Sequence, residues 1–321
     1  ASMATLVPYI AEAPRNALQV RKPTQAKIHS GIVGAMRVLR VQHLDARKVV
    51  NVEIDFEANY TAVIDGKPQG YYVHERWQLE RSAAVQSKPP GPAHAFRCPS
   101  CGAAFASSEG DQCRFCGQDV GGGRFDWTVA HVQLQRQRTQ PPALTADVVE
   151  QGTHDATVVQ PQIRERHAAL IAEDPGATPA LIDARLRTIY ETLNRAWTAR
   201  DLRPVRPFVS DAIYNYLNYW IRAYHEQGLR NELKDMAVER VQIVKLVRDR
   251  YFDAITLRFW ASGFDYTVEA ATGKRVSGNP RRKRAYSEYW TLIRGASVRG
   301  APPDPNNCPS CGAPLDRVNM A

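Results

Sequence analysis

An internal repeat is the feature that most constrains how this chain can fold. Four short stretches recur in the same order, at separations of 200, 203, 213 and 210 residues. Residues 36–42 match 236–242, residues 52–58 match 255–261, residues 74–81 match 287–294, and residues 98–103 match 308–313. Several matches in a preserved order are typical of a duplication. We therefore predict two related units that differ mainly in the lengths of their loops.

The residue pattern within the copies predicts strands in both and long helices in the second. Apolar and acidic residues alternate over residues 52–58, which is the period of a half-buried strand. Asp65-Gly66 predicts a hairpin turn. Apolar residues fall on one helical face over residues 182–197 and again over 213–224, with Ser210 as an N-cap. The predicted fold class is therefore α+β, as two related cone-like units.

These patterns divide the chain into two units, at residues 1–135 and 163–321. Residues 136–162 contain several prolines and no clear period, so we predict a linker there. The first copy is expected to lack the two long helices that precede the strands of the second. The second copy is expected to stop partway through its cysteine motif.

The cysteines predict a metal site. All six lie in CxxC pairs, which indicates metal ligands in a chain of 321 residues. Cys98, Cys101, Cys113 and Cys116 have the spacing of a zinc ribbon, inserted at about residues 95–120. Four thiolates suit the tetrahedral preference of Zn²⁺ and leave no position open for water, so the predicted zinc is structural. Redox disulfides or free thiols are the alternative interpretation.

Half of a second zinc site follows near the end of the chain. Cys308 and Cys311 repeat the first cysteine pair, including the string CPSCGA. By analogy with the first ribbon, their partner cysteines would fall just after Ala321. We therefore expect one fully ligated zinc ion per chain.

The sequence favours a binding protein over an enzyme. Glu75 shares a strand face with Trp77, and Glu288 shares one with Trp290, because side chains two residues apart point the same way. A buried carboxylate there would have a raised pKa and could act as a general base. A glutamate at a strand end, or one paired with an arginine, is the plainer interpretation. No triad spacing and no glycine-rich phosphate loop is present, so we expect no catalytic activity.

The basic charge favours acidic partners. The formal net charge is +9. The densest cluster consists of Lys274, Arg275, Arg281, Arg282, Lys283 and Arg284. We predict that it lies in a loop between strands and binds anionic lipid headgroups; a solvated hairpin tip is the alternative. Acidic residues nearly cancel the basic ones in the ribbon, which argues against nucleic-acid binding, although a nucleic-acid-binding ribbon remains a further alternative.

The cysteine usage also predicts a reducing compartment, on the cytoplasmic side of a membrane. No stretch of about 18 apolar residues is present, so no segment of this sequence is expected to span a bilayer. Attachment to the inner membrane through a segment outside this sequence is left open.

Several stretches of the second copy resemble the Tim44-like family. They are ARDLRPVRPFVSDAIYNYLNYWIRAYHEQGLRN at residues 199–231, FDAITLRF at 252–259, DYTV at 265–268 and YSEYWTLIRG at 286–295. The resemblance covers residues 164–295 and, through the repeat, extends weakly to 36–134. The inserted CPxCGA string is similar to ribbons in bacterial members of the family.

The resemblance implies helices packed on a curved antiparallel sheet, as in nuclear transport factor two and ketosteroid isomerase. It also implies protein partners and a non-enzymatic role at a membrane or in protein transport. The pocket that such cones can hold leaves a small-ligand-binding or isomerase-like enzyme as the alternative function.

Overall fold

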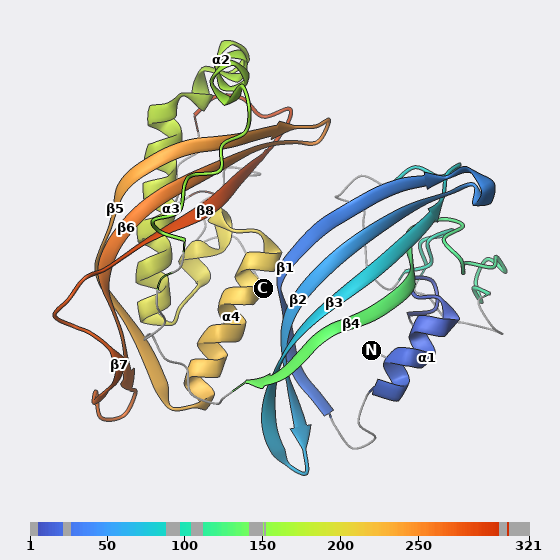
Figure 1. Ribbon diagram of the computed structural model, residues 1–321, viewed down its shortest axis with the longest axis horizontal. Coiled ribbons are helices and arrows are strands. Elements are labelled where there is room, and N and C mark those ends of the chain that lie inside the picture. The colour runs from blue at the N-terminus through green and yellow to red at the C-terminus, as the bar shows by residue number, and fades with distance from the viewer. Residues whose placement is uncertain are drawn as a thin grey trace. The chain divides into compact units, whose positions relative to one another are not determined.

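The computed structural model describes residues 6–21, 27–87, 97–103, 112–140, 150, 152–301 and 307. The chain divides into two compact units, residues 1–142 and 143–321. Each unit is built on its own antiparallel sheet, and helices accompany both sheets (Figure 1). The predicted α+β class is therefore confirmed. No helix among the described residues is long and apolar enough to cross a bilayer.

The first unit is a four-stranded meander in which each strand pairs with the next along the chain. Its elements are α1 (Glu12–Arg21), β1 (Lys27–Leu44), the 3-10 turn η2 (Asp45–Arg47), β2 (Val49–Ile64), β3 (Lys67–Ser82) and β4 (Thr128–Gln140). Asp65 and Gly66 form the turn between β2 and β3, with positive φ angles of 50° and 76°. Two consecutive left-handed residues suit the twist of a tight hairpin, so the predicted turn is confirmed. Helix α1, which the sequence pattern did not predict, lies along β4.

The second unit places its helices before its strands. Its elements are α2 (Ile163–Glu173), η3 (Pro175–Ala177), α3 (Pro179–Ala199), η4 (Arg203–Phe208), α4 (Asp211–Glu226), β5 (Leu229–Arg248), β6 (Phe252–Glu269), β7 (Arg275–Gly278) and β8 (Arg284–Gly295). β6 pairs with β5 along one edge and with β7 and β8 along the other. The Ser210 hydroxyl accepts a hydrogen bond from the N–H of Ile213, which confirms the predicted N-cap of α4.

Helix α3 and the second sheet enclose the main core of this unit. Ile182, Leu186 and Tyr190 extend from one face of α3 onto β6, where Leu257 and Phe259 are fully buried. The spacing of four residues puts these three side chains on one stripe of the helix. The Tyr190 ring packs edge-on against the Phe259 ring at 5.6 Å. The amphipathic pattern that predicted the helix is thus the pattern that buries it.

The strand registers show that the two sheets are related. Phe56 on β2 lies opposite Glu75 on β3, and Phe259 on β6 lies opposite Glu288 on β8. The two phenylalanines therefore occupy equivalent positions, as the repeat predicted. β3 in the first unit corresponds to β8 in the second, so each CPSCGA string follows the equivalent strand.

Two β-bulges fix the correspondence of β1 with β5 and correct one of the sequence matches. The bulges lie between Val33 and Ala35 and between Val38 and Arg40 on β1. On β5 they lie 205 residues later, between 238 and 240 and between 243 and 245. The match of residues 36–42 with 236–242, at a separation of 200, was therefore wrong by five residues. A short apolar motif does not set a register, because each bulge inserts a residue that no sequence pattern marks.

The segment expected as a linker contributes to both units. β4 continues to Gln140, and residues 152–160 contact the second sheet. Arg258 on β6, which is 1% exposed, fastens this segment. It donates to the carbonyls of Gly152, Thr153 and Asp155 and to the hydroxyls of Thr157 and Ser287. Aromatic rings of Trp260 and Tyr289 lie beside its guanidinium group. This arginine is held by dipoles and aromatic rings, and no carboxylate among the described residues pairs with it.

Candidate functional site

Four cysteines come together in the insert between β3 and β4. The Sγ atoms of Cys98, Cys101, Cys113 and Cys116 all lie within 4.8 Å of one another. The Sγ atoms of Cys98 and Cys116 are 3.9 Å apart. Four sulfurs at 2.3 Å from one tetrahedral ion would lie about 3.8 Å apart. The cluster therefore has the size of a metal-binding site.

The two halves of the cluster have the same backbone geometry. In each, the N–H of the first cysteine donates to the carbonyl five residues later, and the glycine four residues later donates back to the cysteine carbonyl. The bonds are Cys98 N to Ala103 O, Gly102 N to Cys98 O, Cys113 N to Gln118 O, and Gly117 N to Cys113 O, at 2.8 to 2.9 Å. Gly102 and Gly117 have φ angles of 76° and 67°, which favour glycine. Each CxxC turn thus directs two sulfurs to one side.

The electrostatics of the cluster suit a cation. Burial raises the pKa of the Cys98 thiol to about 11, and backbone N–H donors only partly offset the effect. Burial also opposes ionisation of Cys113, but the N–H groups of Cys116 and Phe115 outweigh it and lower the pKa to about 7. Hydrogen bonds between the thiols add to this difference, raising the pKa of Cys98 and lowering that of Cys113, and two adjacent thiolates would repel each other. A divalent cation would remove that repulsion, so the four residues fit a metal ion.

A small apolar core supports the metal-binding residues. Cys98 and Cys113 are 1% and 0% exposed, whereas Cys101 is exposed. Val120 forms one buried cluster with these two cysteines, and Val7 and Phe125 pack against it. With four protein ligands available, the site has no open coordination position for water or substrate. The arrangement can stabilise the insert, but it offers no metal-based catalysis.

The chain before α1 fastens the insert to the first sheet. The Tyr9 hydroxyl donates to the carbonyl of Arg97, immediately before Cys98, at 2.5 Å. The N–H of Val129 on β4 donates to the carbonyl of Tyr9 at 2.7 Å. The sequence does not signal this contribution, because residues 1–30 have no clear periodicity. A tyrosine 88 residues from its partner gives no local signal.

Gly123 joins the insert to the sheet at a position where only glycine fits. Its φ angle is 73°, and a Cβ atom there would lie 2.7 Å from the carbonyl oxygen of Glu80 on β3. The carbonyl of Gly123 in turn accepts from the N–H of Ser82, at 3.0 Å. The insert therefore returns to the sheet in a fixed direction. Cys308 and Cys311, predicted as half of a second site, lie outside the described residues.

The predicted glutamate and tryptophan pairs are in contact in both units. Trp77 Nε1 donates to Glu75 Oε2 at 2.8 Å, and Trp290 Nε1 donates to Glu288 Oε2 at 2.6 Å. Each tryptophan also packs edge-on against the equivalent phenylalanine, Phe56 or Phe259. These side chains therefore form part of the sheet face and its packing. Neither glutamate is free of a side-chain partner.

Glu288 is exposed to water as a residue, but protein atoms surround its carboxyl group. The residue remains exposed on the edge strand β8, yet the protein around its carboxyl group raises the pKa through burial. The Trp290 hydrogen bond opposes this rise, Glu150 adds to it, and Arg284 opposes it. The raised pKa was anticipated for a carboxylate on this face. The hydroxyl groups of Tyr190 and Tyr286 hydrogen-bond to each other at 2.7 Å, and both interact electrostatically with this carboxyl group.

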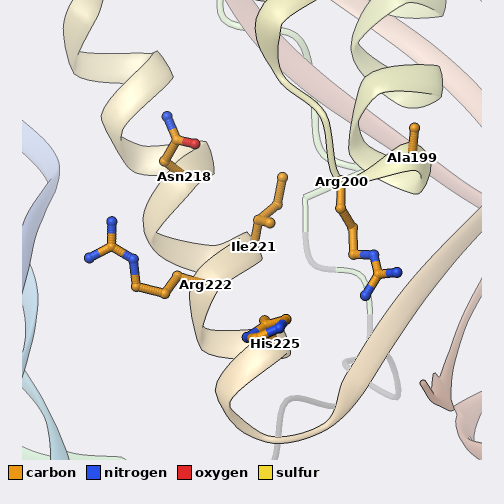
Figure 2. Close-up of a pocket in the computed structure, with 6 residues that line it drawn as sticks. All are labelled: Ala199, Arg200, Asn218, Ile221, Arg222 and His225. Carbon is orange, nitrogen blue, oxygen red and sulfur yellow. The ribbon is translucent and has the colours of Figure 1, made fainter. Parts of the chain in front are cut away.

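A surface pocket lies elsewhere in the second unit. It has a volume of about 520 Å³ and is lined by Ala199, Arg200, Asn218, Ile221, Arg222 and His225. Figure 2 shows Arg200 at the end of α3, whereas Arg222 points to the other side of α4. The two guanidinium groups therefore do not converge, and Glu288 does not line this pocket. The pocket does not have the geometry expected for an isomerase-like active site built on Glu288.

Most of the basic cluster is exposed on two neighbouring turns of the second sheet. Lys274 lies in the turn before β7 and Arg275 is the first residue of β7, whereas Arg281, Arg282 and Lys283 lie in the loop between β7 and β8. Arg284 was predicted to belong with them, and the structure corrects this. It begins β8 and forms ion pairs with Asp265 and Glu150. A run of positive residues in the sequence does not reveal which one meets distant carboxylates.

Comparison with known proteins identifies one part of the chain. The model of the Tim44-like domain matches residues 168–306, which include α3, α4 and the whole second sheet. A solved structure described as "Ntf2 like protein involved in plasmid conjugation" is 9% identical over 92% of this chain and 88% of that chain. Its TM-score is 0.20, which is too low to carry an argument. No curated protein sequence matches. The second unit of this chain therefore contains a Tim44-like domain, over residues 168–306.

Proposed function

We propose that this protein is a non-enzymatic docking protein, with one structural zinc ion and an anionic membrane surface as the binding partner of its second unit. The observation that carries the membrane role is the set of five exposed cations at the two ends of the short strand β7: Lys274, Arg275, Arg281, Arg282 and Lys283. Among the described residues, none of them forms an ion pair with a carboxylate. Each basic residue near an anionic surface contributes about 1 kcal/mol of attraction.

The chemistry of the cysteine cluster supports zinc as its metal. Thiolate ligands select soft or borderline ions, and four of them in a tetrahedron are typical of structural zinc. An insert of this size has little apolar core of its own, so metal binding would supply most of its folding energy. For zinc-finger peptides this contribution is roughly 10–16 kcal/mol.

Two observations support a non-enzymatic role. Glu75 and Glu288 both accept a hydrogen bond from their own tryptophan, and neither lines the pocket between α3 and α4. The four-cysteine site has no open position at which a metal could activate water. A scaffold that holds partner proteins at a membrane is the role that fits these features and the Tim44-like domain together.

Vesicle sedimentation tests the membrane role. The chain should pellet with phosphatidylglycerol vesicles at low salt and not with phosphatidylcholine vesicles. Replacing Arg281, Arg282 and Lys283 with serine should weaken binding on the order of 100-fold, because about 3 kcal/mol of attraction is lost. The salt dependence should also become shallower, since fewer charges are screened.

A matched variant controls for net charge. Arg164, Arg166 and Arg195 are exposed on α2 and α3, and replacing them with serine removes the same three charges. This variant should bind nearly as well as the unaltered chain. If both triple variants lose binding equally, the attraction is a general charge effect. Failure of the unaltered chain to bind anionic vesicles at low salt would rule out the membrane role.

A further inference from the structure

Strand β1 carries an apolar strip that is open to water, at the edge of a face that is buried or half-buried on β2. Val33, Met36, Val38 and Val41 on β1 are 49%, 61%, 56% and 59% exposed. They lie opposite Ala58, Phe56, Ile54 and Val52 on β2, so all eight side chains share one face of the sheet. An exposed apolar strip of this length is typical of an interaction surface.

The other face of this sheet carries ion pairs. Asp55 on β2 pairs with Arg76 at 2.8 Å and with His74 at 3.3 Å. Glu57, two residues later, pairs with Arg37 of β1 at 2.5 Å. A sheet with ion pairs on one face normally buries the other face against a second layer. We therefore expect the exposed apolar residues of β1 to be covered by a binding partner.

The repeat shows which kind of element covers this face. The 205-residue correspondence equates Val33, Met36, Val38 and Val41 with Val238, Val241, Ile243 and Leu246 of β5. In the second unit these residues are buried or half-buried. Helix α3 packs over the same core through Ile182, Leu186 and Tyr190. In the first unit the described helix, α1, lies along β4, at the opposite edge of the sheet from β1.

A hydrogen bond between α3 and β5 adds a polar feature to this packing. Arg187 of α3 donates from Nη1 to the carbonyl of Val238 at 2.6 Å, and Asp183 holds the same guanidinium group. Val238 stands at the β5 bulge, and Val33 stands at the equivalent bulge of β1. A helix with an arginine at the matching place could therefore make the same bond to Val33.

We propose that the apolar face of the first sheet binds an amphipathic α-helix of a partner protein, packed against β1 as α3 packs against β5. The helix carries aliphatic or aromatic side chains at positions i, i+4 and i+8, with an arginine at i+5. A second copy of this chain is a poor source, because its own α3 is in use and Leu186 there is fully buried. The inference is independent of the membrane role, since the basic turns lie in the second unit.

A peptide with the sequence of residues 178–200 is a direct probe, because it contains a helix that fits the equivalent face. It would be labelled and titrated with the full chain while its fluorescence anisotropy is measured. Binding should saturate, and the peptide with Leu186→Asp should not bind. Val41→Asp in the chain should weaken binding about tenfold or more, because it places a charge in the apolar contact.

The neighbouring residue provides the matched control. Gln42 is also exposed on β1, but it lies on the opposite face, opposite Asn51. Gln42→Asp adds the same charge to the same strand and should leave binding within about twofold. Both substituted positions are exposed, so both variants should keep the far-ultraviolet circular dichroism spectrum of the parent chain.

Three results would overturn the inference. The first is no saturable binding of the peptide, and the second is an equal loss with Val41→Asp and Gln42→Asp. The third is a dimer in sedimentation that Val41→Asp disperses, which would assign the face to a second copy of the chain.

Discussion

Trp290 donates a hydrogen bond from its indole Nε1 to Oε2 of Glu288, two residues earlier on the same face of β8, at 2.6 Å. Trp77 and Glu75 make the equivalent bond on β3, at 2.8 Å. The duplication therefore preserved a side-chain interaction as well as a strand register. The bond satisfies the indole N–H on a face that also carries aromatic packing, where an unpaired donor would be destabilising.

Glu288→Gln should stabilise the protein at neutral pH. Burial raises the pKa of Glu288 in the folded chain, so the ionised carboxylate is less favourable there than in the unfolded chain. That destabilisation appears as pH rises through the unfolded pKa, at about 4.3, and is absent below it. Thermal unfolding of both chains should show a gain for the variant at about pH 7 that disappears by about pH 4. Glu239→Gln, at an exposed position on β5, is the control and should not show this pH-dependent gain. A gain in the melting temperature of the Glu288→Gln variant that does not vary with pH would contradict the explanation.

Asp174→Asn should have the opposite pH dependence. Asp174 is 0% exposed, accepts from the N–H groups of Gly176 and Gly300, and pairs with Arg294. Burial opposes its ionisation, but these donors outweigh it and hold the pKa below the usual value. The stabilisation is present above the unfolded pKa, at about 3.9, and is lost as pH falls through the lower folded pKa.

The melting temperature of the Asp174 variant should therefore fall at neutral pH and approach that of the parent chain in acid. Glu173→Gln provides the comparison, because Glu173 is 52% exposed and its ion pair with Arg248 is open to solvent. Glu173→Gln should lower the melting temperature less than Asp174→Asn does. A larger loss for Glu173→Gln would show that Asp174 does not hold the corner between α2 and α3 to Gly300.

Arg258→Met should destabilise the second unit by roughly 2–4 kcal/mol, because the hydrogen bonds of a buried guanidinium group to three carbonyls and two hydroxyls are lost. Arg258→Lys should recover only part of the loss, since an ammonium group does not reproduce the planar fork. Chemical denaturation measures both changes. Arg240 also lies over Trp260, with its guanidinium carbon 3.5 Å from the ring centroid, but is exposed. Arg240→Lys should change stability by less than about 1 kcal/mol; a comparable loss there would assign the effect to the aromatic contact.

Features governed by a local period were predictable from the sequence. In β8, side chains two residues apart point to the same face, and this places Glu288 beside Trp290. In α3, the helical period directs Ile182, Leu186 and Tyr190 toward the sheet. The two CxxC pairs brought four sulfurs together because each turn depends on only a few adjacent residues. In each case the residues that give the signal are also the residues in contact.

Features that depend on distant partners were not predictable in this way. Arg284 stands in a basic run, but its partners Asp265 and Glu150 lie 19 and 134 residues away. The bulges of β1 and β5 insert Gly34 and Leu39 in one copy and Glu239 and Val244 in the other. Gly34 and Glu239 share no chemistry, and Leu39 and Val244 are aliphatic like many strand residues, so nothing in the sequence marks these positions as bulges. The register comes from the pairing of whole strands.

Metal analysis should give one zinc ion per chain, bound by Cys98, Cys101, Cys113 and Cys116. Cys98→Ser should abolish this zinc, because it removes a buried ligand that is 1% exposed, and three thiolates hold zinc less tightly than four. Without metal the insert should unfold, while the circular dichroism of the sheets persists. The measurement is elemental analysis after gel filtration in a zinc-free buffer.

Cys308→Ser is the matched control for that experiment, since Cys308 begins an identical CPSCGA string. The pair Cys308 and Cys311 supplies two thiolates, which leave a zinc ion with open positions and a weaker site. Cys308→Ser should therefore leave the stoichiometry at about one, whereas Cys98→Ser brings it to about zero. A monomer that binds two zinc ions would contradict the prediction, as would a loss of zinc with Cys308→Ser. Either result would mean that the second CPSCGA string finds further ligands within this chain.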